Sequence, residues 1–143
     1  MRNTITLRTL GPDDFDRLMA VPEGLFDGPM RADQARAFLQ DPLHECVLAF
    51  DGELAVGMAT GTVLLHPDKA PSMFVNEVGV RDAYRRQGIG RQVTAHLFAV
   101  ARARGCQGIW LGTEQDNAPA LALYRSMDGD EVAGVYFGWD DGL

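Results

Sequence analysis

Residues 76–90, near the middle of the chain, combine the residue types that bind anions. They read Asn-Glu-Val-Gly-Val-Arg-Asp-Ala-Tyr-Arg-Arg-Gln-Gly-Ile-Gly. We expect this stretch to begin as a strand, pass through an arginine-rich turn and open a long helix at its two glycines. Glycines let a ligand approach the backbone closely, and the free N–H groups of a first helical turn favour negative charge. The stretch therefore predicts a pyrophosphate site, with Arg85 and Arg86 beside it.

The alternative is an ordinary strand-to-helix loop with a solvated arginine cluster. The stretch has neither the Gly-Lys-Ser/Thr of a Walker loop nor the GxGxxG of a dinucleotide turn. The charge distribution favours the anion site. The chain carries −7 in total, but residues 81–91 hold four arginines and one aspartate, a local +3, so the remainder carries −10. One concentrated basic turn in an acidic protein indicates a polyanionic ligand at that turn.

The composition indicates one soluble globular domain spanning residues 1–143. Of these residues, 46% are hydrophobic and 23% charged, which suits a single core. No apolar run approaches the ~20 residues of a membrane span, and the N-terminus has no apolar signal region. We therefore expect a cytoplasmic protein without a membrane partner. The negative net charge argues against nucleic-acid binding.

The metal-binding residue types show no ligand spacing. Cys46 and Cys106 lie far apart without a Cys-x-x-Cys pattern, and the three histidines are scattered. We expect no metal site, and we expect both cysteines to be small buried or semi-buried residues.

Hydrophobic periodicity and turn residues predict the elements that must position the loop. Alternation predicts strands, recurrence at i, i+3 and i+4 predicts helices, and Asp51-Gly52 predicts a hairpin. Gly57 and Gly61 indicate a bend or bulge, and the continuously apolar strand at 108–112 should be buried. The fold class is α/β (mixed α+β), with a central mixed β-sheet of six to seven strands flanked by about four helices. We predict strands at about 4–10, 45–50, 53–65, 72–80, 108–112 and 131–137, and helices at about 12–19, 31–40, 88–104 and 117–127.

On these features the chain resembles the GNAT superfamily of N-acetyltransferases. The family's coenzyme A motif, Gln/Arg-x-x-Gly-x-Gly/Ala, is matched by Arg85, Gly88 and Gly90, and the order of elements is also the family's. The resemblance implies acetyl-CoA (coenzyme A) as cofactor, with its pantetheine arm along Val78 and Val80 and its pyrophosphate on the N–H groups of residues 86–91. The cofactor-binding residues it implies are Val78, Gly79, Val80, Arg85, Arg86, Gln87, Gly88, Ile89, Gly90, Arg91, Asn117 and Tyr124.

Asn117 and Tyr124 form a second match. Seven residues apart on a helix, they lie on one face, two turns apart. In the family, the asparagine helps to hold the cofactor near its acyl end and the tyrosine lies near the thioester sulfur. The alternatives are a plain helix cap for Asn117 and a core aromatic residue for Tyr124. One departure concerns the chain after this helix, where Met127-Asp128-Gly129-Asp130 stands in place of the family's frequent Gly-Phe.

Acetyl transfer to an amine needs a base for the ammonium proton and an acid for the departing thiolate. Glu77 is the candidate base, directly or through water, and Tyr124 is the candidate acid. Backbone N–H groups at Val78 or Gly79 could polarise the thioester carbonyl. The alternative for Glu77 is a cross-strand salt bridge or a surface carboxylate. No Ser-His-Asp or Cys-His arrangement is compelling, so direct transfer is preferred over an acyl-enzyme.

The acceptor is predicted to be a small cationic amine. Residues 112–143 hold seven acids against one arginine, including Asp140 and Asp141, a field that would concentrate a polycation. Asp27, in the loop between the first two helices, could join Glu77 in binding it. The alternative is an acidic surface that serves only solubility.

A narrower resemblance is to the GNAT-type aminoglycoside 3-N-acetyltransferases. In those enzymes a carboxylate stands where Glu77 does, and acidic side chains clamp the antibiotic's ammonium groups. The leading hypothesis is thus 3-N-acetylation of an aminoglycoside, an antibiotic-resistance activity. A polyamine, other small amine or protein amine is the second acceptor class, and a non-catalytic acyl-CoA sensor is the third hypothesis. The oligomeric state stays open, with a homodimer as one option. The matching stretches are residues 25–26, 74–80, 85–89 and 120–124.

Overall fold

The structure, a computed structural model, describes residues 4–140 and contains five strands and four α-helices there. The chain divides into two compact units, Met1–Gly112 and Thr113–Leu143, and the first contains all five strands. That residues 1–143 form a single domain stays a prediction. The elements, with η for a short 3-10 helix, are β1 (Ile5–Thr9), η1 (Pro12–Asp14), α1 (Phe15–Met19), α2 (Ala32–Gln40), β2 (His44–Asp51), β3 (Leu54–Leu64), β4 (Ser72–Val80), η2 (Asp82–Tyr84), α3 (Ile89–Ala103), β5 (Gly108–Trp110) and α4 (Ala118–Ser126).

The strands form one mixed sheet in the order β1-β2-β3-β4-β5. Neighbours from β1 to β4 are antiparallel, and β5 joins β4 in parallel. The mixed sheet and the four α-helices confirm the predicted fold class. The described sheet has five strands, fewer than the six to seven predicted.

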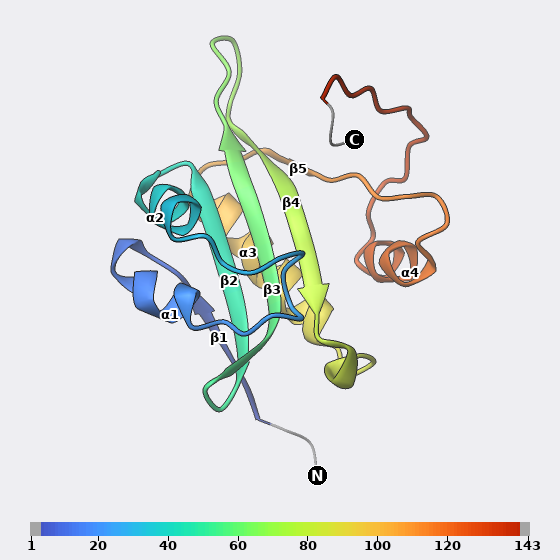
Figure 1. Ribbon diagram of the computed structural model, residues 1–143. Helices are drawn as coiled ribbons and strands as arrows, with labels where there is room; N and C mark the ends of the chain where they lie inside the picture. The colour runs from blue at the N-terminus through green and yellow to red at the C-terminus, as the bar shows by residue number, and fades with distance from the viewer. Residues whose placement is uncertain (1–3, 141–143) are drawn as a thin grey trace. The chain divides into compact units, whose positions relative to one another are not determined.

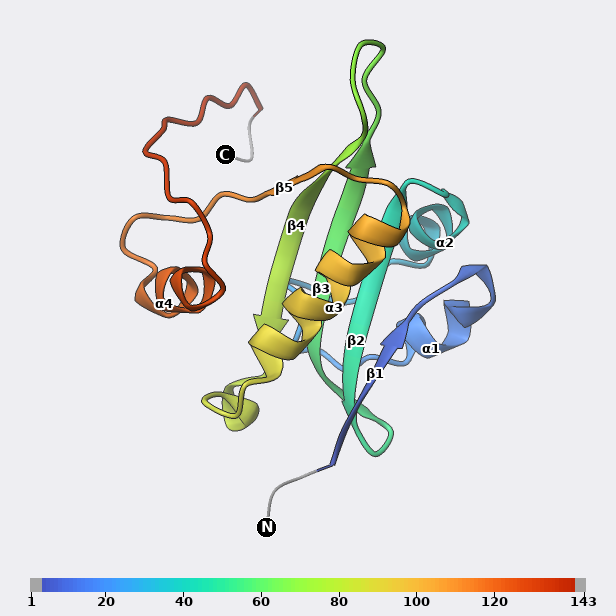
Figure 2. The same ribbon diagram turned by 180° about the vertical axis from the view of Figure 1, so that it is seen from behind.

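Helices cover both faces of the sheet. α3 lies along one face (Figure 2), and α1 and α2 lie over the other (Figure 1). Because both faces are covered, the central strand β3 is buried along most of its length. The predicted helical spacing of 88–104 is confirmed, since the apolar side of α3 is buried in the core. That side consists of Ile89, Val93, Leu97 and Ala101.

Glycines in β3 allow α3 and the neighbouring strands to approach closely. A Cβ on Gly57 would lie 2.5 Å from the side chain of Ile89, so only glycine fits beneath the first turn of α3. The register of β3 against β4 shifts between Thr60 and Gly61, which confirms the bulge predicted there.

The predicted last strand, at about 131–137, is wrong. Residues 129–139 have no regular secondary structure. A strand requires a hydrogen-bonding partner, and none of the described strands pairs with this segment. Its large apolar side chains, which suggested the strand, are 74% to 89% exposed. These side chains are Val132, Val135, Tyr136, Phe137 and Trp139.

The predicted burial of strand 108–112 is also wrong. β5 is shorter than predicted, and Trp110 is 52% exposed. The physical reason is its place at the edge of the sheet, where β4 is its one neighbour. Trp110 instead rests against Phe74 of β4, with 4.5 Å between ring centroids.

The second unit is built around α4. The side chain of Asn117 caps the helix by accepting the N–H of Ala120 at 3.2 Å, and a proline follows in the first turn, as predicted. The helix ends at a left-handed residue, Asp128 (φ 63°), after which Gly129 N–H bonds back to Tyr124 O. Arg125 then bonds Glu131 at 2.7 Å.

Between residues 4 and 140, no helix is both long and apolar enough to cross a membrane.

Asp14 connects β1 to the first helical turn. Its buried carboxylate accepts the N–H of Gly11 at 2.8 Å and two hydrogen bonds from Arg8, at 2.9 and 3.2 Å. Burial raises the pKa of this carboxyl, but the bonds from Gly11 and Arg8 outweigh burial and hold the pKa below its ordinary value of 3.8.

We expect Asp14→Asn to lower the free energy of unfolding by about 1–3 kcal/mol at neutral pH, because a charge-assisted buried acceptor is lost. The folded-state pKa lies below the unfolded one, so this stabilisation is complete above the unfolded pKa and disappears as the pH falls through the folded pKa. Urea titrations across that range test this. Asp16→Asn, at an exposed neighbouring position, is the control. An equal, pH-independent loss in both variants would contradict the assignment.

Candidate functional site

β4 presents an edge on which a ligand can pair. β5 pairs with β4 at Ser72, Met73 and Phe74 and ends there, whereas β4 continues to Val80 (Figures 1 and 2). The strand pairing described for this side of β4 therefore stops before Val75. Residues 78–80, the predicted pantetheine segment, lie on the part of β4 that β5 does not cover. An extended amide-containing chain fits such an edge, as in strand addition by peptides.

The bulge in β4 determines where its polar side chains point. Gly61 lies opposite Val75 and Thr60 lies opposite Glu77, so Asn76 is the extra residue. Directly opposed residues share a face, which places Glu77 with Thr60 on the sheet face away from α3. Asn76 exchanges hydrogen bonds with the side chain of Thr62 at 3.0 and 3.2 Å. The bulge thus turns two consecutive polar residues out of the core.

Glu77 lies in an acidic, partly desolvated setting. Burial raises the pKa of its carboxyl above the ordinary 4.5, and the negative charge of Asp27 raises it further. Asp27 comes from the loop between α1 and α2, so the structure brings together two carboxylates that the sequence predicted for one site. A carboxylate with a raised pKa is a better proton acceptor than an ordinary one.

Cys46 lies on the same sheet face, opposite Thr60 in the register of β2 and β3. Burial, followed by the charges of Glu77 and Glu45, raises the pKa of its thiol to about 12. The thiol is therefore protonated at neutral pH and is a poor nucleophile. The predicted burial of both cysteines is confirmed.

The loop after β4 has the geometry of an anion site. Arg86 and Gly88 both adopt left-handed conformations, with φ of 63° and 78°, and Gly88 is the N-cap of α3. Such alternation turns successive N–H groups toward one side, at the positive end of a 15-residue helix. Arg85 is exposed and pairs with Asp82 at 3.1 Å.

Two of the predicted cofactor residues also anchor this loop. The side chain of Ile89 is buried in the core, so Ile89 can contribute only its backbone to a ligand. The carbonyl of Gly90 accepts the buried hydroxyl of Thr94 at 2.6 Å. The N–H groups of the first helical turn are thereby held on a rigid element.

The structure identifies two residues near this loop that the sequence did not single out. Tyr84 donates its hydroxyl to Asp51 at 2.6 Å and so attaches η2 to the β2–β3 hairpin. Arg81, counted with the basic turn, donates instead to three backbone carbonyls at 2.7 Å each. Nothing in the spacing distinguished it from the arginines that remain at the surface.

Four of the predicted site residues belong to the second unit. Tyr124 is partly buried, and burial raises the pKa of its hydroxyl, so it is protonated at neutral pH. Asn117 caps the helix in the structure, and its contact with the cofactor stays a prediction. Because Tyr124 and Glu77 belong to different units, a joint role for them stays a prediction. Asp140 is exposed, and Asp141 lies outside the described residues.

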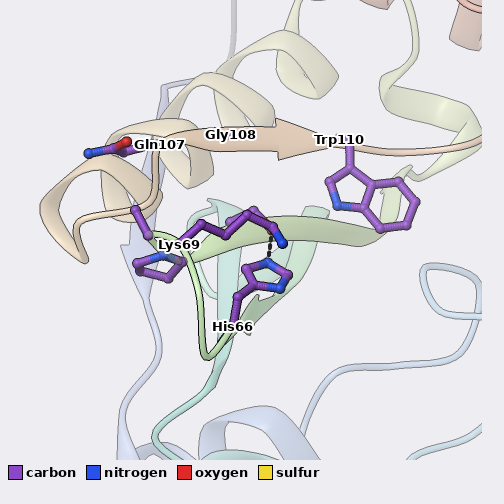
Figure 3. Close-up of a pocket in the computed structure, with 8 residues that line it drawn as sticks. His66, Lys69, Gln107, Gly108 and Trp110 are labelled. Carbon is purple, nitrogen blue, oxygen red and sulfur yellow. Dashed lines mark hydrogen bonds between the residues drawn. The ribbon is translucent and has the colours of Figure 1, made fainter.

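A pocket of about 440 Å³ lies elsewhere, at the start of β4 and β5 (Figure 3). Its lining includes His66, whose Nε2 is 3.2 Å from Ser72 Oγ, together with Lys69 and Trp110. It shares no residue with the predicted site, which lies at the other end of β4, a distance of about 25 Å for a strand of this length. Among residues 4–140, no group of three or more His, Cys, Asp or Glu side chains could hold a metal ion.

Comparison with known protein families identifies the family of the chain. Residues 13–128 match the acetyltransferase (GNAT) family, and the chain belongs to that family. The cofactor of this family is acetyl-CoA, and the open β4 edge and the loop at Gly88 fit its pantetheine and pyrophosphate portions.

Two relatives in sequence are longer proteins. The chain is 33% identical over 131 residues to an uncharacterized protein of Mycobacterium leprae (strain TN), covering 90% of this chain and 35% of that protein. It is 35% identical over 85 residues to the [ribosomal protein bS18]-alanine N-acetyltransferase of Escherichia coli (strain K12), covering 59% of this chain and 53% of that enzyme. The chain thus spans between about a third and a half of these relatives.

Solved structures share the fold at low sequence identity. An aminoglycoside acetyltransferase from an uncultured soil metagenomic sample has a TM-score of 0.85 and 18% identity, covering 96% of this chain and 98% of that one. The aminoglycoside N-acetyltransferase AAC(6')-Iy in complex with CoA has a TM-score of 0.78 and 17% identity, covering 99% and 97%.

Gly88→Ala tests the anion loop. A side chain at φ 78° strains the loop, and we expect coenzyme A affinity to fall about tenfold, which is a loss of about 1.4 kcal/mol. Gly105→Ala is the matched control. Gly105 has φ 81°, follows α3 at its other end and, like Gly88, has open space where a Cβ would stand. Both variants should lose about 1 kcal/mol of stability, but only Gly88→Ala should weaken binding in calorimetry. Equal affinities would contradict the site.

Proposed function

We propose that the chain transfers the acetyl group of acetyl-CoA directly to a primary amine of a small cationic acceptor, an aminoglycoside. The observation that carries this proposal is the continuity of one segment. The edge of β4 left uncovered by β5, the carboxylate of Glu77 and the left-handed turn at Gly88 follow one another within residues 75–90. A cofactor extended along this segment would have its thioester beside a proton acceptor.

The backbone of this segment performs the binding. Val78 and Val80 would pair through their amide groups with the pantetheine arm, and N–H groups of residues 86–91 would hold the pyrophosphate. Arg85 and Arg86, both exposed, would neutralise its charge. Acetyl-CoA supplies the activated acetyl group as a thioester.

Glu77 is assigned the base. An aliphatic ammonium must lose a proton before its nitrogen can attack, and the raised pKa of Glu77 increases its proton affinity. Tyr124 is assigned the acid that protonates the departing thiolate, because its own raised pKa keeps its hydroxyl protonated. N–H groups at Val78 or Gly79 would polarise the carbonyl.

Direct transfer is favoured over an acyl-enzyme. Cys46 is the thiol on the sheet face of Glu77, and its pKa of about 12 keeps it protonated. An attack by the acceptor amine itself needs no protein nucleophile.

The acceptor assignment depends on charge. Asp27 and Glu77 lie close enough for one charge to raise the pKa of the other, and a bound polycation would relieve that repulsion. Asp140 and Asp141 are proposed to add to the same field. The aminoglycoside acetyltransferases among the similar folds support this acceptor class. We propose the 3-amino group, on the resemblance of residues 74–80 and 85–89. The 6'-amino group is the competing position.

A protein N-terminus is the second candidate acceptor. It is favoured by the 35% identity to the Escherichia coli enzyme whose name specifies the alanine of ribosomal protein bS18. A peptide beginning with alanine would offer one α-amine and would not need a clamp of carboxylates.

Release of free thiol from acetyl-CoA over a panel of amines tests the proposal. We expect turnover with gentamicin-type aminoglycosides, weaker turnover with polyamines and none with an alanine-initiated peptide. Nuclear magnetic resonance of the product assigns the acetylated nitrogen. Turnover with the peptide alone would establish the second candidate. Tight coenzyme A binding without turnover on any amine, and no rate effect of Tyr124→Phe, would indicate a sensor instead.

The pH dependence of kcat tests Glu77. A base must be deprotonated, so activity should fall on the acidic side at a pH above the 4.5 of an ordinary glutamate. Asp27→Asn removes the neighbouring negative charge, and we expect it to move this acidic limb of the pH profile of kcat to lower pH. Glu77→Gln should lower kcat by about 10²–10⁴-fold. A limb that does not move in Asp27→Asn would contradict the pairing of the two carboxylates.

A further inference from the structure

Arg81 joins two segments that are far apart in sequence. Its Nε donates to the carbonyl of Ala55 in β3, and its two terminal nitrogens donate to the carbonyls of Pro22 and Glu23, each at 2.7 Å. Pro22 and Glu23 lie in the segment between α1 and α2, which has no helix or strand of its own. The guanidinium thus holds this segment against the end of β4.

The segment packs closely against the side chain of Arg81 and against β4. Gly24 has φ 105°, and a Cβ there would lie 2.9 Å from the Nη1 atom of Arg81. A Cβ on Gly79 of β4 would lie 3.3 Å from the carbonyl oxygen of Leu25. Leu25 itself is buried in the core beneath α1 and α2. The backbone of this segment therefore crosses β4 at van der Waals distance, directly before Phe26 and Asp27.

The backbone of Arg81 also forms part of the turn that leads to the predicted cofactor loop. Its own N–H bonds Val56 O at 2.9 Å, and its carbonyl accepts the N–H of Tyr84 at 2.8 Å, which closes η2. One residue thereby joins the turn that leads to the anion loop and the segment that carries Asp27.

We propose that Arg81 is a positioning residue for the acceptor, holding residues 22–27 so that Asp27 faces Glu77. The inference rests on the proposed function, since it names which part of the site Arg81 serves. The contacts of Arg81 support this role over that of a pyrophosphate ligand, because three of the five N–H donors of its guanidinium already bond main-chain carbonyls. Lysine cannot replace it, because one ammonium group cannot reproduce a planar fork that reaches two segments.

Kinetics of Arg81→Lys and Arg81→Met test the positioning role. We expect KM for the acceptor to rise about tenfold or more in both, because hydrogen bonds that hold the segment are lost. The dissociation constant of coenzyme A should change less than about twofold, since the anion loop keeps its other contacts. Arg102→Met, at an exposed position in the last turn of α3, is the matched control and should leave both unchanged. A parallel loss of cofactor and acceptor affinity would overturn the proposal.

Gly24→Ala tests the same contact with Arg81 by a change in the segment itself. Its methyl group would displace the guanidinium or the segment, so we expect the same selective rise in acceptor KM. The effects of Gly24→Ala and Arg81→Met should not add in the double variant, because each breaks the same contact. Full additivity would overturn the proposal.

Hydrogen exchange separates this inference from the proposed function, because it needs no turnover. Arg81→Lys and Arg81→Met should raise amide exchange in residues 21–30 while leaving β2 and α3 protected. Unchanged exchange in residues 21–30 would overturn the positioning role even in an active enzyme. Raised exchange in a chain that acetylates no amine would support the clamp and reject the proposed function.

Discussion

The backbone groups on the open side of β4 are the constraint on which the site depends. An N–H or C=O group on a strand edge requires a partner, and β5 supplies one only as far as Phe74. Beyond that point none of the described strands pairs with this side of β4, and a ligand with amide groups of its own can do so. This uncovered part of β4 leads directly into the turn at Arg81 and then into α3. The uncovered edge and the anion loop are thus consecutive parts of one segment, in which the bulge at Asn76 sets the face of Glu77.

Much of the fold could be predicted because it depends on local signals. The Asp51-Gly52 turn, the asparagine cap and proline of α4, and the four apolar residues at helical spacing in α3 each act within a few residues. The wrong predictions concern segments whose structure depends on parts of the chain far away in sequence. Val135 and Phe137 alternate like a strand, but alternation does not supply a hydrogen-bonding partner. Trp110 looked buried because its position at the sheet edge cannot be seen from its own segment.

The anion loop could be predicted because it is formed by residues that are consecutive in the sequence. The glycine at 88 and the order of strand, turn and helix suffice to expect an anion site. The proximity of Asp27 to Glu77 could only be suspected, since they are 50 positions apart in the sequence with two strands, β2 and β3, between them. The clamp at Arg81 could not be predicted. Its partners are main-chain carbonyls, which every residue carries, so no side-chain pattern indicates them.

The burial of both cysteines has a practical consequence for measuring this chemistry. Cys46 and Cys106 are 2% and 8% exposed, and burial raises the pKa of each thiol. Reagents that detect free thiols react with the thiolate form at accessible sulfur atoms. The folded protein should therefore be nearly silent toward such a reagent. A colour that develops during turnover reports coenzyme A, and a signal from the protein alone reports unfolding.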